Sequence, residues 1–342
     1  MKAYNLPNSR IFAEYDPERK DDARTSLSDL CQQLLTQQKA AWPRLKSGWE
    51  AVASPHVRTV NCGDFSVKIQ FNPQRMVSSA AKVDSASITA RPCFLCPANL
   101  PEAQGGILYH RNFLILCNPF PIFTQHFTIS SLDHQPQTLE GYLDEFLSLA
   151  RSLAPSLAAF YNGPQGGASA PDHLHFQACP AGSLPVEVQL EDGRPCLPVM
   201  RHLSASVFRV ENLDRSVLMI EGSEVKVLSE TIEKVLAVMK TSTAVGSDAE
   251  PMLNAHATFK EGKWRILLFP RQKRRPDLYY QEGPERVLVS PGSVEMGGLI
   301  VTPVERDFKR LNPELVCHIY REVSANPDLM DGWTDQLSRM TD

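Results

Sequence analysis

A ten-residue run from Pro171 to Pro180, PDHLHFQACP, constrains the fold more than any other stretch of the chain. Proline breaks regular structure, so the two prolines mark the ends of one short element, which we predict to be a β-strand. Side chains alternate between the two faces of a strand. The polar side chains at 173, 175 and 177 therefore share one face, and the apolar side chains at 174, 176 and 178 face the core.

The polar face of this strand consists of His173, His175 and Gln177. An imidazole can attack a phosphorus atom and carry a nucleotidyl group as a covalent intermediate, and a neutral amide beside it can donate a hydrogen bond to a phosphoryl oxygen. The alternative is a solvated strand face, because short motifs often occur by chance. The preceding segment 162–170, NGPQGGASA, favours the chemical interpretation, since glycines let backbone amides approach a phosphate closely.

A second motif, Arg91 to Pro97 (RPCFLCP), contains two cysteines three positions apart. Cys93 and Cys96 bring two thiolates within reach of one tetrahedral zinc ion, but they are half of a site. A redox dithiol is the alternative, although the flanking prolines favour a metal-binding loop. His134 and His173 follow at similar intervals and are candidates for the two missing ligands.

Hydrophobic periodicity predicts a chain of mixed helices and strands. Steps of three and four residues predict helices over 26–41, 138–152, 224–240 and 303–323. A further apolar turn is expected after the second of these helices, up to residue 161. Alternating or apolar runs predict strands over 57–61, 64–72, 113–117, 127–129, 205–212, 216–221, 252–259, 264–269, 286–290 and 298–302, and residues 1–24 are expected to form an extended arm.

Two loops carry cations that can meet an anion. Arg75 follows the strand predicted over 64–72, and the run 270–276, PRQKRRP, follows a predicted hairpin. Each is interpreted either as phosphate-binding or as an ordinary solvated loop. His126 precedes the strand predicted over 127–129 and has no partner apparent in the sequence, so we expect it to be structural.

Composition limits the classes of function. The net charge of −4 among 342 residues argues against general attraction to nucleic acid. No run approaches the roughly 20 apolar residues that span a bilayer, and the first 24 residues lack the apolar core of a signal peptide. We therefore expect a cytoplasmic protein with no membrane or nucleic-acid partner.

The motifs resemble the nucleotidyltransferase and phosphorylase branch of the histidine-triad superfamily. The segment 173–177 is similar to its His-x-His-x-Gln signature, and Gly166-Gly167-Ala168-Ser169 is similar to its glycine-rich approach. This branch includes galactose-1-phosphate uridylyltransferase, diadenosine tetraphosphate phosphorylase and GDP-galactose phosphorylase. Cys93, Cys96, His134 and His173 resemble the zinc ligands of the uridylyltransferases, whereas the strand with Asn254, the segment 269–271 and Gly297-Gly298 resemble the phosphorylases.

The resemblance implies a role for each matching residue. His175 would attack the α-phosphorus of a nucleotide and hold the nucleotidyl group, and Gln177 would bind the transferring phosphoryl group. The substrate would be bound by Gly167 and Ser169 of the glycine-rich loop and by Arg75 and Arg271. Ser169, Arg75 and Arg271 would contact its phosphate oxygens. Phosphate or a sugar phosphate would be the acceptor, and a zinc ion held by four protein ligands would be structural.

The expected fold is α+β and similar to that of the histidine-triad proteins, with antiparallel sheets, helices packed on one face and two related halves. An N-terminal arm and helix would span 1–63, a catalytic half 64–180 and a second half 181–342, and a homodimer is a candidate assembly. A nucleotide hydrolase and a non-enzymatic, zinc-stabilised nucleotide-binding module are the alternatives, and Gln177, in place of a third histidine, argues against the hydrolase.

Overall fold

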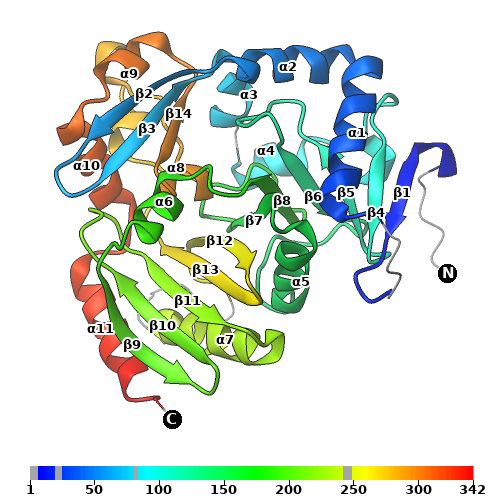
Figure 1. Cartoon of the computed structure of the whole chain (residues 1–342). Helices are drawn as coiled ribbons and strands as arrows, with labels where there is room; N and C mark the ends of the chain where they lie inside the picture. The colour runs from blue at the N-terminus through cyan, green and yellow to red at the C-terminus, as the bar shows by residue number, and fades with distance from the viewer. Residues whose placement is uncertain (1–6, 20–24, 81–82, 242–248, 342) are drawn as a thin grey trace.

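The computed structural model describes residues 7–19, 25–80, 83–241 and 249–341, and one large, mostly antiparallel sheet runs through it (Figure 1). The strand order is β1-β4-β5-β6-β8-β7-β12-β13-β11-β10-β9, and the edge strand β1 pairs with β4 in parallel. In that order the strands are β1 (Ile11–Tyr15), β4 (Gly106–Tyr109), β5 (Phe113–Cys117), β6 (Phe127–Ser131), β8 (His175–Pro180), β7 (Leu157–Asn162), β12 (Leu253–Lys260), β13 (Lys263–Pro270), β11 (Leu218–Gly222), β10 (Ala205–Val210) and β9 (Cys196–His202).

A smaller sheet joins a segment from the first quarter of the chain to a segment near its C-terminal end. It contains β14 (Leu299–Thr302), β3 (Ser66–Phe71) and β2 (His56–Asn61) in that order. The C-terminal strand β14 pairs in parallel with β3, and β3 pairs antiparallel with β2. The segments expected over 1–63, 64–180 and 181–342 thus each contribute a strand to one sheet.

The two faces of the large sheet carry separate hydrophobic cores. Along β7, Ala159 and Tyr161 belong to one core, and Ala158 and Phe160 belong to the other, as strand alternation requires. The first core includes side chains of α1 (Leu27–Ala41), α5 (Leu143–Leu153), α7 (Val225–Thr241) and α11 (Pro327–Ser338), and the second those of the small sheet, α6 (Pro185–Glu191), α8 (Ser293–Met296) and α10 (Pro313–Val323). The expectation of helices on one face was therefore wrong, because a chain this long covers both faces of its sheet.

Short helices fill the connections between these layers. They are α2 (Pro43–Ala53), α3 (Met76–Ser79), α4 (Ser85–Thr89) and α9 (Glu305–Arg310), with 3-10 turns at η1 (Asn8–Arg10), η2 (Pro73–Arg75), η3 (Pro97–Asn99), η4 (Asp277–Tyr279) and η5 (Gly283–Glu285). Among the described residues, no helix combines the length and the apolar character that crossing a membrane requires.

Three predicted elements were wrong, each for a local reason. The apolar turn expected up to 161 is β7, whose buried side chains occupy both faces and so show no periodicity. The strand expected over 286–290 is a loop, in which the Leu288 backbone N–H donates to the Asp307 carboxylate instead of to a strand. The helix expected over 303–323 is divided into α9 and α10, because Asn312 caps a new helix that starts at Pro313.

The strand that carries the signature lies at the centre of one half of the large sheet. β8 pairs with β6 and β7, which places Gln177 between Thr128 and Phe160. Leu174, Phe176 and Ala178 are buried in the first core as predicted. The strand begins at His175, and not at 171, so His173 lies in the loop that enters it.

Candidate active site and metal centre

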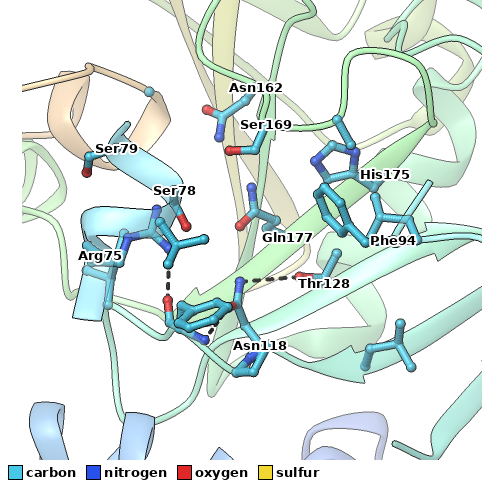
Figure 2. A pocket seen from close by; sticks show the side chains of 18 of the residues that line it. Arg75, Ser78, Ser79, Phe94, Asn118, Thr128, Asn162, Ser169, His175 and Gln177 are labelled. Atoms are coloured by element: carbon cyan, nitrogen blue, oxygen red, sulfur yellow. Dashed lines mark hydrogen bonds between the residues drawn. The ribbon is translucent and has the colours of Figure 1, made fainter. Parts of the chain in front are cut away.

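A cavity of about 710 Å³ lies beside the polar face of β8 (Figure 2). Its wall combines the ends of β5 and β7, the glycine-rich loop, the turn after β3 and the segment that enters α8. Five residues expected at the substrate site line it, namely His175, Gln177, Gly167, Ser169 and Arg75. The apolar part of the wall includes Trp42, Phe94, Phe120 and Phe160.

The imidazole of His175 is buried at the start of β8, with 6% of the residue exposed. Its Nδ1 lies 2.8 Å from the backbone oxygen of His173, and a carbonyl oxygen can only accept, so Nδ1 carries the proton. Nε2 then carries the lone pair, and the ring borders the cavity. Burial lowers the pKa of His175 to about 4, so the ring is neutral near pH 7, as a nitrogen nucleophile must be.

Gln137 fixes the backbone at the start of β8. Its Oε1 accepts the His175 backbone N–H at 2.8 Å. Its Nε2 donates to the His175 carbonyl at 3.0 Å and to the Asn162 carbonyl at 2.8 Å. The buried Gln137 side chain therefore holds the start of β8 against the end of β7, and no sequence signal distinguished it from any other loop glutamine.

The glycine-rich loop packs too closely against the second half of the chain for side chains. A Cβ atom on Gly166 would overlap the Leu253 carbonyl oxygen, and one on Gly167 would lie 2.9 Å from the Pro291 carbonyl oxygen. Gly167 also has φ 114°, a conformation that glycine adopts without strain. The loop can therefore pass between β12 and the segment before α8, and it leaves Ser169 on the cavity wall beside Asn162 (Figure 2).

Three arginine side chains line the cavity, and one of them, Arg91, donates to the backbone oxygen of Ser169 in the glycine-rich loop at 3.2 Å. Arg75 is anchored by donation from Nη1 to the Phe120 carbonyl at 2.8 Å, and Glu295 on the same cavity stabilises its charge. Arg91 lies over the Phe94 ring at 4.8 Å, and its Nη1 is buried without a hydrogen-bond partner. Arg44 also lines the cavity, so three guanidinium groups and one carboxyl group surround it.

Arg271 lies outside this cavity, contrary to the phosphate contact expected for it. Its guanidinium group is buried, with 4% of the residue exposed. It donates to Asn254 Oδ1 at 2.7 Å, to the Pro291 carbonyl at 2.9 Å and to the Val323 carbonyl at 3.1 Å, and its Nη2 donates to carbonyls 273 and 274. With its N–H groups used by protein acceptors, Arg271 positions the loops that form the cavity.

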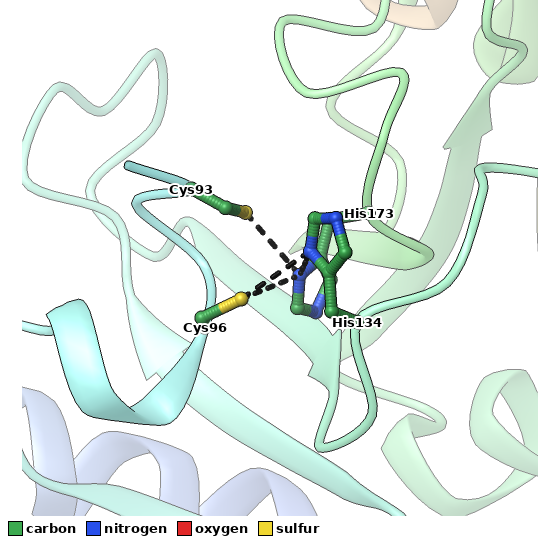
Figure 3. A group of neighbouring side chains, drawn as sticks. All are labelled: Cys93, Cys96, His134 and His173. Carbon is green, nitrogen blue, oxygen red and sulfur yellow. Dashed lines mark hydrogen bonds between the residues drawn. The ribbon is translucent and has the colours of Figure 1, made fainter. Parts of the chain in front are cut away.

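The four expected metal ligands come together in one cluster (Figure 3). Cys93 Sγ and Cys96 Sγ lie 3.3 Å from His173 Nδ1 and His134 Nδ1, respectively. The two Nδ1 atoms are 3.3 Å apart. Ligand bonds of about 2.0 to 2.3 Å in a tetrahedron give edges of roughly 3.3 to 3.8 Å, so the donor atoms match a zinc ion in type and spacing.

Contacts beyond the four donor atoms also fit a metal ion. His173 Nε2 lies 2.8 Å from the Ser131 carbonyl oxygen, which fixes the proton on Nε2 and turns the Nδ1 lone pair toward the cluster. His173 is fully buried, and its own carbonyl accepts the Nδ1 proton of His175. The cluster can thus hold a metal ion such as zinc. One of its four residues, His173, is hydrogen-bonded through its backbone carbonyl to the candidate nucleophile His175.

Several cavity residues were not predicted as site residues. Asn162, Asn118, Arg44, Arg91 and Glu295 line the cavity. Asn162 and Asn118 are polar residues at the ends of apolar strands, which is a usable signal. Arg44, Arg91 and Glu295 lie far apart in the sequence, and only tertiary packing brings them to one site.

Comparisons with known proteins support the fold. Residues 34–180 match a family model described as Domain of unknown function (DUF4922), which covers less than half of the chain. A search of curated protein sequences finds no match. Among solved structures, the yeast Ap4A phosphorylase Apa2 in complex with AMP matches with a TM-score of 0.55 and 15% identity, over 86% of this chain and 96% of that chain.

The same yeast protein in complex with Ap4A matches with a TM-score of 0.53 and 15% identity, over 86% of this chain and 97% of that chain. The chain therefore has the fold of an Ap4A phosphorylase, and the resemblance expected from the sequence motifs is confirmed at the level of fold.

Proposed function

We propose that the protein is a nucleotidyltransferase that works through a nucleotidyl-histidine on His175. The observation that carries this proposal is the state of the His175 ring. Its Nδ1 proton is donated to the His173 carbonyl, which leaves Nε2 unprotonated, and the ring borders a cavity that three guanidinium groups also line. A neutral imidazole with a fixed tautomer beside an anion-binding wall is suited to attack on phosphorus.

In the first step, His175 Nε2 attacks the α-phosphorus, and the bond from phosphorus to the leaving phosphate oxygen breaks. The electron pair of that bond goes to the departing sugar phosphate or nucleotide. The ring becomes positively charged when Nε2 is bonded to phosphorus, and the His173 carbonyl at 2.8 Å from Nδ1 stabilises that charge. In the second step, an oxygen of the acceptor attacks the same phosphorus, and Nε2 recovers its electron pair.

The other cavity residues bind and orient the phosphoryl groups. Gln177 lies one strand repeat from His175 and supplies an amide donor on the same face. Ser169 and Gly167 bring the glycine-rich loop to the cavity wall, where the loop contacts the phosphoryl groups. The guanidinium groups of Arg75, Arg91 and Arg44 compensate the phosphate charges. Positioning and charge compensation account for most of the acceleration of phosphoryl transfer.

The proposed donor is a nucleotide sugar or a dinucleoside polyphosphate, and the proposed acceptor is phosphate or a sugar phosphate. The complexes of the yeast phosphorylase with AMP and Ap4A support a nucleotide ligand for this fold. Apart from the edge strand β1, the large sheet divides into β4-β5-β6-β8-β7 and β12-β13-β11-β10-β9, with α5 and α7 on the same face. We further propose that these two five-stranded parts are two histidine-triad-like halves of one catalytic unit.

We propose that zinc occupies the cluster of Cys93, Cys96, His134 and His173 as a structural ion. All four positions would be filled by protein ligands, which leaves none for substrate. The chain's own residues would perform the chemistry, and the ion would hold the loop that enters β8.

Product analysis with and without added phosphate tests this function. The protein is incubated with Ap4A, GDP-sugars, UDP-sugars or ADP-sugars, and the nucleotide products are separated by chromatography. We expect turnover that requires phosphate or a sugar phosphate and yields the corresponding nucleoside diphosphate or nucleotide sugar. Release of the nucleoside monophosphate at the same rate without any acceptor would instead establish a hydrolase.

A further inference from the structure

His126 is the buried histidine that sequence analysis left without a role. It precedes β6 and has 3% of its surface exposed. Its ring packs beside Phe123 and Phe160, with ring centroids 6.1 Å and 5.8 Å away. The expectation of a purely structural residue rested on the lack of a partner in the sequence, but the structure gives both ring nitrogens a polar partner.

The protonation of this ring follows from a backbone group. The Ile122 N–H donates to His126 Nδ1 at 3.0 Å. A backbone N–H can only donate, so Nδ1 must be unprotonated, and the proton of the neutral ring resides on Nε2. His126 Nε2 lies 3.0 Å from Gln177 Oε1, and it therefore donates to that oxygen.

The surroundings keep the ring neutral. Burial, and then the positive charge of Arg75, lower the pKa of His126 to about 3. A doubly protonated ring would also place a proton on Nδ1 against the Ile122 N–H. The single tautomer with the proton on Nε2 thus persists over the pH range in which the protein is expected to work.

The tautomer determines which way the Gln177 amide faces. With its oxygen held by His126, the amide nitrogen is on the side of the cavity that Gln177 lines with His175 (Figure 2). The reversed amide would place its N–H₂ against the Nε2 proton, so two donors would face each other. Among the described residues, the Gln177 amide nitrogen has no hydrogen-bond partner, which leaves both of its protons for a ligand oxygen.

We propose that His126 is a positioning residue, which locks the Gln177 amide with its N–H₂ group toward the phosphoryl group that His175 attacks. This inference rests on the proposed function and adds to it the source of the amide orientation. A chain of donors runs from the Ile122 backbone through His126 and Gln177 to the substrate, so the direction of the last hydrogen bond is set by the first.

The kinetic test measures the rate of nucleotidyl-enzyme formation in single-turnover experiments with a donor that the wild type accepts. His126→Phe keeps an aromatic side chain and removes both hydrogen bonds. We expect a rate loss of roughly 10- to 100-fold with little change in donor affinity, because a preorganised donor acts mainly on the transition state. His126→Gln, whose terminal amide can supply a donor near the position of Nε2, is expected to recover most of the rate.

A double-mutant cycle separates positioning from general damage. If His126 acts through Gln177, then His126→Phe in a Gln177→Ala background should cause almost no further loss. Phe123→Leu serves as the matched control, because it loosens packing against the same ring and leaves both hydrogen bonds. Wild-type rates in His126→Phe, or full additivity with Gln177→Ala, would overturn the proposal.

Nitrogen-15 NMR of the wild-type protein tests the same inference without any substrate. We expect His126 to show a protonated Nε2 and an unprotonated Nδ1 from pH 5 to 8, and the opposite tautomer would overturn the proposal even if His126→Phe fails to fold. If the wild type forms no adduct with any donor, the proposed function fails, and the tautomer alone then decides whether His126 orients Gln177.

Discussion

At the residue scale, the chemistry depends on side chains whose protonation is fixed by backbone groups. His175 Nδ1 faces a carbonyl oxygen, whereas His126 Nδ1 faces a backbone N–H. The two imidazoles therefore adopt opposite tautomers although both are neutral. The strand pattern predicted that His175 lies on a polar face and the family resemblance implied its role, but the role proposed for His126 depends on a contact with Ile122 that no periodicity encodes.

Glu250 gives a prediction for the dependence of stability on pH. It accepts hydrogen bonds from Tyr161 Oη at 2.6 Å and from the Leu139 backbone N–H. Burial raises the pKa of Glu250 from 4.5 to about 7. Because the folded state binds this proton more tightly than the unfolded state, the stabilisation is complete below pH 4.5 and is lost as the pH rises through 7.

Glu250→Gln should remove this pH dependence, because the amide is uncharged at every pH. Its oxygen can accept the Leu139 backbone N–H, and its N–H₂ group can donate to the Tyr161 hydroxyl oxygen in place of the contact with Oε2. Between pH 5 and 8, we expect the free energy of unfolding of the wild type to fall relative to the variant by about 2 kcal/mol. Denaturant unfolding at both pH values measures it, and Glu102→Gln on an exposed loop is the control. Parallel pH profiles for wild type and Glu250→Gln would contradict the assignment.

At the element scale, the loop that enters β8 is fixed by two sets of contacts. The cysteine and histidine cluster joins the loop at 93–96, the turn after β6 and the loop before β8. Gln137 fixes the first backbone group of the strand. The sequence predicted the cluster and the strand, because donor types and alternation are local signals, but it placed the start of the strand four residues too early. The real start is determined by the pairing of His175 with Ser130 on β6.

Removal of the metal should destabilise the loop that enters β8. We expect about one zinc ion per purified chain, and removal by a chelator should lower the melting temperature by at least about 5 °C and slow nucleotidyl transfer. Cys96→Ser should reproduce both effects, whereas Cys62→Ser should leave zinc content and melting temperature nearly unchanged. A metal-free wild type with an intramolecular disulfide between Cys93 and Cys96 would support the redox interpretation instead.

At the scale of the whole molecule, the cavity belongs to neither half alone. β7 pairs with β12 across the middle of the large sheet, which places Asn254 opposite Asn162. The basic run after β13 then connects the cavity-forming loops, because Arg274 donates to the Pro164 and Ala168 carbonyls and Arg275 donates to Ser290 Oγ. The cations expected to bind phosphate or face solvent are instead largely used within the protein.

Arg271→Met tests this structural role against the phosphate role expected from the sequence. Loss of the guanidinium group leaves Asn254 Oδ1 and several buried carbonyl oxygens unpaired, so we expect a destabilisation of at least about 3 kcal/mol in denaturant unfolding. Arg271→Lys should recover little, since an ammonium group cannot reach so many acceptors at once. Arg339→Met, on an exposed helix end, is the control.

A stable Arg271→Met variant with weakened substrate binding would show that Arg271 contacts the substrate. The sequence could not distinguish the two roles, because a buried structural arginine and a phosphate-binding arginine occur in the same kind of loop. The partners in this case come from residues 254, 291 and 323, which only the assembled fold brings together.

The most direct test of the account is the intact mass of the protein after brief mixing with GDP-sugars, UDP-sugars, ADP-sugars and Ap4A, read under mildly alkaline conditions that preserve phosphohistidine. We predict a gain of one nucleotidyl group with at least one donor, its loss on addition of the acceptor, and no gain in a folded His175→Ala variant. An adduct that persists in His175→Ala, or no adduct with any donor in the folded wild type, would contradict covalent transfer through His175.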